Sequence, residues 1–216
     1  MELAATALVL AIAAANLAVM AWMMRGITFE SPGTDGELQV DSASQARSWK
    51  WPSGMHRYAK EKARMKDMGL LMLVIMQRLL GDRTTFYPLA VGCALAHSIT
   101  SVLVFLVASG YWGTGIGLVL FGLYIACLWP YMIVLQGGYQ GLSVMFLLFS
   151  MYFLQMAEGT GMASSGIWIL LSGAAFTAMV FSSASSRKLI PLALAAFIFS
   201  QTPEVSSLRI RSLIPE

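Results

Sequence analysis

A single histidine stands in the longest uncharged stretch of this 216-residue sequence, and its imidazole is the side chain there best suited to chemistry. Residues 84–157 contain no Asp, Glu, Lys or Arg, and they include His97. Titratable groups inside a membrane are costly and often functional, so one interpretation is axial ligation of a haem or of a chlorophyll-type pigment such as bacteriochlorophyll. The other interpretation is a neutral histidine that is hydrogen-bonded to a neighbouring helix. Four small neighbours would let a macrocycle approach: Ala94, Ala96, Ser98 and Ser101.

The remaining polar residues do not form a known catalytic or metal-binding set. Asp35, Glu37 and Asp41 have a spacing that suits a metal ion or an acid–base pair, but their Gly- and Ser-containing surroundings are typical of a solvated loop. Asp67 stands at the junction with an apolar segment. The sequence has no Ser-His-Asp set, HExxH, CxxC pair or Walker signature. We therefore predict no catalytic residue and no metal site, which weighs against an enzyme.

A basic and aromatic segment precedes the uncharged stretch. Between Arg47 and Lys66 the only acid is Glu61. Basic and aromatic side chains together are typical of a segment that lies on an anionic membrane surface. We therefore predict anionic lipids as partners and no binding of nucleic acid. The predicted membrane-surface residues are Arg47, Lys50, Arg57, Lys60, Lys62, Arg64, Lys66, Trp49 and Trp51.

The composition indicates that a membrane positions these residues. The chain is 57% hydrophobic and only 12% charged, with a mean hydropathy of +0.69, whereas soluble domains carry about 25% charged residues. Long apolar runs without a polar face predict an all-α integral membrane protein with about five or six transmembrane helices plus a basic amphipathic interfacial helix. The predicted spans are 3–24, 86–109, 116–135, 142–157 and 166–183, with a short sixth run at 189–199.

The apolar stretch 68–80 is too short to be one of these spans. Its 13 residues reach about 20 Å, against a hydrocarbon core of about 30 Å. We expect an interfacial or re-entrant helix that continues the basic one and stops at Gly81. The short glycine-rich connectors 110–115 and 136–141 predict antiparallel hairpins between neighbouring spans. Pro130 is expected to kink the span that contains it.

The charge pattern divides and orients the chain. We predict an N-terminal anchor (1–25), a polar linker with the basic interfacial helix (26–83), a multi-span bundle (84–200) and a tail (201–216). The first run starts with Glu2 instead of a basic residue, which favours a retained anchor over a secretory signal. Ten of the 14 Lys and Arg residues lie between positions 25 and 83, so this loop is expected to be cytoplasmic and the N-terminus outside. The Arg187–Lys188 pair falls on the same side, and we expect a bacterial inner membrane.

The order of several motifs resembles the early membrane region of the GT-C class of polytopic glycosyltransferases, which use polyprenyl-phosphate sugars. The resemblance covers roughly half of the chain. It implies an enzyme with an essential acidic residue on the first extracytoplasmic loop, for which Asp35 or Asp67 are the candidates. The motifs that carry it are Gly81-Asp82-Arg83, Tyr87-Pro88-Leu89, Tyr111-Trp112-Gly113, Trp129-Pro130 before Gly137-Gly138, and the Gly173-centred span that ends in a basic pair.

Three functions stay open from the sequence. The first is a non-catalytic integral membrane subunit of a larger complex, with other integral membrane subunits as partners. Small residues such as Gly117, Gly122 and Ala126 would let neighbouring helices pack closely in that case. The second is a truncated or complete GT-C-like glycosyltransferase, and the third is a pigment- or haem-binding subunit that ligates through His97.

Overall fold

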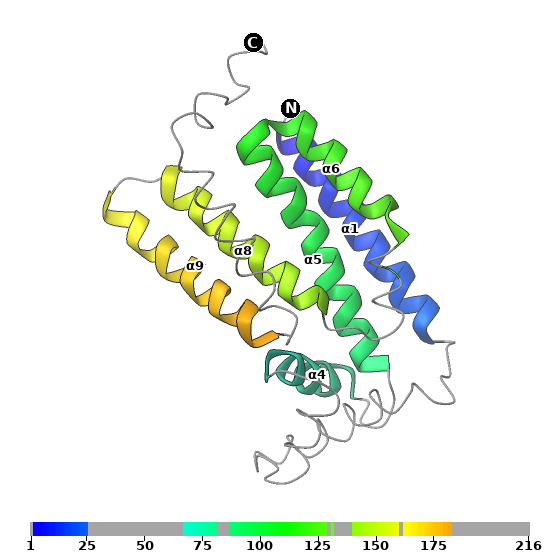
Figure 1. Cartoon of the computed structure of the whole chain (residues 1–216). Helices are drawn as coiled ribbons and strands as arrows, with labels where there is room; N and C mark the ends of the chain where they lie inside the picture. The colour runs from blue at the N-terminus through cyan, green and yellow to red at the C-terminus, as the bar shows by residue number, and fades with distance from the viewer. Residues whose placement is uncertain are drawn as a thin grey trace.

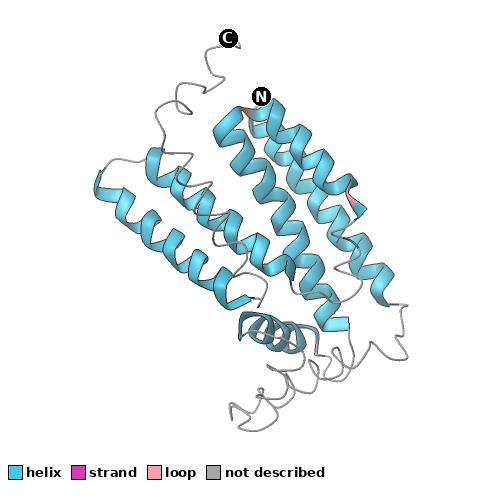
Figure 2. Ribbon diagram, viewed as in Figure 1, coloured by secondary structure: helices cyan, strands magenta, loops and turns pink. Residues whose placement is uncertain are grey.

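The structure, a computed structural model, describes residues 2–25, 67–81, 87–128, 131, 140–159 and 162–182. Within these ranges the regular structure is entirely α-helical (Figure 2). The prediction of an all-α membrane protein is confirmed. The described helices are α1 (Glu2–Arg25), α4 (Asp67–Leu80), α5 (Tyr87–Trp112), α6 (Thr114–Ala126), α8 (Gln140–Gly159) and α9 (Met162–Ser182).

Four of the described helices are long and apolar enough to cross a membrane, namely α1, α5, α8 and α9. They match the predicted spans to within a few residues. With 24 and 26 residues, α1 and α5 reach about 36 and 39 Å, more than a hydrocarbon core of about 30 Å. The predicted sixth run, 189–199, lies outside the described residues.

α5 is the centre of the bundle (Figure 1). Its most apolar window is 67% buried, against 22% for the corresponding windows of α1, α8 and α9. α1, α6, α8 and α4 all pack against α5, and α9 pairs with α8. Polar residues on α5 are therefore enclosed by protein, whereas most residues of α1, α8 and α9 face away from the bundle.

α1 and α5 run antiparallel in a fixed register. Arg25 ends α1, and its Nε donates a hydrogen bond of 3.3 Å to the hydroxyl of Tyr87, which begins α5. Further along both helices, Val9 packs with Phe105 and with Phe121 of α6. The two contacts lie 16 residues apart on α1 and 18 apart on α5, so the helices stay in contact along most of their length.

α5 and α6 form the predicted antiparallel hairpin through one residue, Gly113. Its positive φ of 90° suits glycine, and its amide donates to the Ser109 carbonyl at 2.9 Å. Gly117 lets the two helices approach closely. A Cβ at that position would collide with the Ser109 side chain and lie 3.0 Å from the Phe105 carbonyl oxygen.

α6 is shorter than the predicted span 116–135, because the helix ends at Ala126. Cys127 has an extended backbone, with φ −72° and ψ 122°. The cause is visible in the sequence, since Pro130 has no N–H to donate to the Ala126 carbonyl and its ring clashes with that carbonyl in a helix. Pro130 itself lies outside the described residues. Leu128 and Tyr131 are helical again, so the predicted span is interrupted at Cys127, within one turn of the proline that was expected to kink it.

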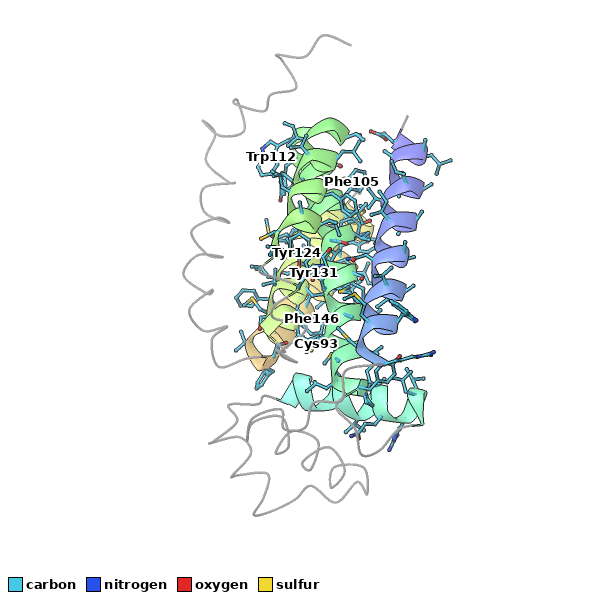
Figure 3. The ribbon with its side chains drawn as sticks, turned by 90° about the vertical axis from the view of Figure 1, so that its right-hand side faces the viewer. Cys93, Phe105, Trp112, Tyr124, Tyr131 and Phe146 are labelled. Atoms are coloured by element: carbon cyan, nitrogen blue, oxygen red, sulfur yellow. The ribbon has the colours of Figure 1, made fainter. Side chains whose placement is uncertain are left out.

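α4 runs across the end of the bundle where α1 ends and α5 begins (Figures 1 and 3). It ends at Leu80, and Gly81 follows with a positive φ of 69°, as expected for a glycine stop. The predicted interfacial helix is thus a separate helix oriented across the spans. The basic segment expected to precede it, from Arg47 to Lys66, lies outside the described residues.

Candidate functional site

His97 lies inside the bundle, near the middle of α5. It stands about 15 Å along the helix from Tyr87, and its side chain is only 3% exposed. Its Nδ1 shares a hydrogen bond of 3.1 Å with the hydroxyl of Tyr124 on α6. A hydrogen bond to a neighbouring helix is the arrangement expected from the second interpretation of this histidine.

Two tyrosine rings flank the imidazole of His97. The Tyr124 ring stacks on it with centroids 5.1 Å apart and planes inclined by 25°. The Tyr131 ring lies 4.9 Å away at 58°. Figure 3 shows both tyrosines close together at mid-height in the bundle. The histidine is therefore sandwiched by aromatic faces.

Tyr131 extends the contacts to α1. Its hydroxyl donates a hydrogen bond of 3.3 Å to Oδ1 of Asn16. Thr100, one turn beyond His97 on α5, also lies near the Tyr124 side chain. We call these five residues, Asn16, His97, Thr100, Tyr124 and Tyr131, the His97 cluster.

The hydroxyl groups near His97 bond to their own helix. Thr100 Oγ1 donates to the Ala96 carbonyl at 2.7 Å, and Ser101 Oγ donates to the Ser98 carbonyl at 2.7 Å. Such bonds satisfy a buried hydroxyl without a partner helix. Thr100 and Ser101 therefore need no hydrogen-bonding partner from another helix.

The free ring nitrogen of His97, Nε2, is the atom that the metal of a haem or chlorophyll would bind. That atom is covered by protein, and within the described part of the chain it has no hydrogen-bonding partner. The four small neighbours singled out in the sequence are also buried: Ala94, Ala96, Ser98 and Ser101. Axial ligation of a haem or pigment by His97 stays a prediction from the sequence.

Metal-binding groups are not assembled within the described ranges. No group of three or more His, Cys, Asp or Glu side chains there could hold a metal ion. Asp35, Glu37 and Asp41 lie outside those ranges. Asp67 begins α4.

A second set of polar contacts joins the α8–α9 hairpin and ties it to α5. The hydroxyls of Ser150 and Ser172 lie 2.9 Å apart, and Ser172 Oγ also donates to the Ser150 carbonyl at 3.0 Å. Gln155 on α8 donates through Nε2 to the Val107 carbonyl of α5 at 2.8 Å. Gly110 leaves room for this amide, since a Cβ there would lie 2.9 Å from it.

Several motifs behind the GT-C resemblance fall on helix boundaries. Gly81 ends α4, Tyr87-Pro88-Leu89 begins α5, and Tyr111-Trp112-Gly113 forms the turn into α6. Helix ends of this kind occur in many membrane proteins and do not identify one family. The motifs Asp82-Arg83, Trp129-Pro130 and Gly137-Gly138 lie outside the described residues, and the resemblance stays a prediction.

Sequence reasoning missed four members of the His97 cluster: Asn16, Thr100, Tyr124 and Tyr131. A signal was present for three of them. Asn16 is the only asparagine in the chain, and it interrupts an otherwise apolar run. Tyr124 and Tyr131 are seven residues apart, a spacing that would place both on one face of a helix.

Comparison of the chain with protein-family models, with curated proteins and with solved structures finds no match.

Proposed function

We propose that the chain is a non-catalytic integral membrane subunit of a larger membrane protein complex. Three pairs of described polar residues support this function because their side chains hydrogen-bond to one another. His97 bonds Tyr124, Asn16 bonds Tyr131, and Ser150 bonds Ser172. Such contacts hold helices together in lipid.

The observation that carries the proposal is a break in the helix at Cys127. α6 starts beside the end of α5, and its 13 residues reach about 20 Å, so the break lies about 10 Å short of the far interface. Cys127 has an extended backbone and is exposed, and Leu128, which is helical again, is 78% exposed. Non-helical backbone at membrane depth is tolerated only where protein or a water-filled cavity covers it. We infer that a neighbouring subunit covers this break.

The outer face of α6 suits a close helix partner. Gly115, Gly122 and Ala126 are all exposed there. A Cβ added at Gly115 or Gly122 would meet no described atom within 4 Å. Small residues let a partner backbone approach closely. Gly117, by contrast, is used within the chain against α5.

The proposed location is a bacterial inner membrane, with the N-terminus outside and residues 26–83 in the cytoplasm. The helix ends that lead into the basic segments support this orientation. Arg25 ends α1 and Ser182 ends α9 at the same end of the bundle (Figure 1). In the sequence, α1 is followed by the segment from Arg47 to Lys66, and α9 by Arg187 and Lys188. Basic loops on one side are expected to face the cytoplasm and its anionic lipids.

A pair of matched variants tests the proposal. Gly122→Leu adds a bulky side chain to the outer face of α6, and Gly173→Leu adds the same side chain to the exposed face of α9, where a Cβ also meets no described atom within 4 Å. Each tagged variant is expressed in place of the native chain, and its complex is extracted in mild detergent for native mass measurement.

Gly122→Leu is expected to reduce the fraction of the chain in the large complex, whereas Gly173→Leu leaves it unchanged. If both variants changed this fraction equally, the outer face of α6 would not be the contact with the neighbouring subunit. A wild-type chain that is never recovered with a second membrane protein would contradict the subunit function itself.

A further inference from the structure

α4 lies at one end of the bundle, at a level that the ends of the other helices define. Arg25 and Tyr87, which are joined by their hydrogen bond, mark this end. Arginine and tyrosine are typical of the membrane–water interface. α4 crosses the helices here (Figures 1 and 3). Its axis therefore lies closer to the plane of the membrane than to the direction of the spans.

One face of α4 packs on α5 on the side of that interface that leads into the membrane. Met76 is buried, and Met72 packs against the hydrophobic core that includes Leu89. A Cβ added at Gly92 would lie 3.0 Å from Met76 Cγ and 3.1 Å from Met72 Cε. Gly92 stands about 7.5 Å inside α5 from Tyr87. α4 thus contacts α5 at a depth that corresponds to the outer part of the hydrocarbon region.

A neighbouring face of α4 is apolar and exposed. Leu71, Ile75 and Leu79 follow one another at four-residue intervals and are 52%, 44% and 72% exposed. Residues at this spacing share one face of a helix. Arg78, also exposed, lies beside them, and its long aliphatic stem lets the guanidinium group reach the headgroup level. We call these four residues the outer face of α4.

We propose that the outer face of α4 is a lipid-contact surface, with its three apolar side chains among the acyl chains of one leaflet. The argument joins the depth of the α4–α5 contact with the cations at this end. Arg25 and Arg78 complement the phosphates of phospholipids, whereas three large apolar side chains in water would lose the favourable transfer free energy of burial. α4 thereby anchors the junction between the linker and the bundle in the leaflet. This inference does not depend on the subunit function.

Spin labels on the full-length chain test the surface. The two native cysteines are first replaced (Cys93→Ala and Cys127→Ser), and a nitroxide is attached at Ile75→Cys or Leu79→Cys. Glu158→Cys, at the exposed C-terminal end of α8, serves as the control that faces water. The protein is reconstituted in vesicles of equal parts zwitterionic and anionic phospholipid. Collision with oxygen, which concentrates in acyl chains, is compared with collision with a water-soluble nickel chelate.

Labels at Ile75→Cys and Leu79→Cys are expected to collide more with oxygen than with nickel, and the Glu158→Cys label more with nickel. Strong nickel collision at both α4 sites would overturn the proposal, since the face would then lie in water. Protection from both reagents would also overturn it, because a protein would then cover the face. Dipolar broadening between singly labelled chains would identify that protein as a second copy.

Discussion

In two regions of the bundle, different kinds of polar side chain join the helices. α1, α5 and α6 meet around the His97 cluster, where aromatic, imidazole and amide side chains from distant parts of the sequence make contact. The α8–α9 hairpin is joined by small hydroxyls, with Ser150 and Ser172 only 22 residues apart. The first region thus joins large polar side chains, whereas the second pairs two small buried hydroxyls.

The difference follows from how much protein surrounds each helix. Lipid tails are as apolar as leucine, so burying apolar surface between helices adds little, and close packing and hydrogen bonds decide which faces meet. α5 is enclosed and can carry large polar side chains such as His97. Most of the surface of α9 faces away from the bundle, as Leu170 at 74% exposed shows. On its buried side, α9 contacts α8 through Ser172.

The largest expected effect comes from closing the gap between α5 and α6. In Gly117→Val, the added carbons meet the Ser109 side chain and the Phe105 carbonyl, so we expect a loss of about 2–3 kcal/mol in the free energy of unfolding. Unfolding of the chain in bicelles by a denaturing detergent measures it. Gly122→Val, on the outer face of the same helix, is the control and should not share this loss. Equal losses would show that α5 and α6 do not approach at Gly117.

The His97 cluster should give an intermediate effect with measurable coupling. His97→Leu and Tyr124→Phe both remove the imidazole–hydroxyl bond. A double-mutant cycle, read by the same unfolding assay, should give a coupling free energy of about 0.6–1.7 kcal/mol. Additive losses would mean that the two side chains do not interact. Identical visible absorption by the wild type and His97→Leu is also expected, since His97 Nε2 is covered by protein.

The smallest effect is expected in the hairpin. Ser172→Ala removes both hydrogen bonds to Ser150, and we expect a loss of about 0.6 kcal/mol. Thr177→Ala on the same helix is the control, because the Thr177 hydroxyl is exposed and bonds only the Gly173 carbonyl one turn back. If the loss at Ser172 exceeded that of the His97 cluster, the contrast between the two regions would be reversed.

The sequence predicted the long helices well because hydrophobic length alone sets them. The ranges 3–24, 142–157 and 166–183 fall on α1, α8 and α9. Hydropathy alone does not locate the break at Cys127, since the run 116–135 stays apolar through Pro130 and hydropathy does not register a missing N–H. The kink expected from Pro130 was the better guide to this position.

The candidate site was predicted only through its central residue. His97 was visible as a lone histidine in an uncharged run. Its partners depend on which helix faces pack together, and apolar runs of similar hydropathy do not encode this pairing. The register of α1 against α5 brings Asn16 near the level of His97, a relation between residues 81 positions apart.

The measurement that tests the subunit function most directly is the native mass of the wild-type chain extracted gently from its own membrane. The account predicts a particle far above 23.4 kDa plus bound detergent, with a second membrane protein in fixed proportion. A stable, monodisperse particle of one chain would contradict it.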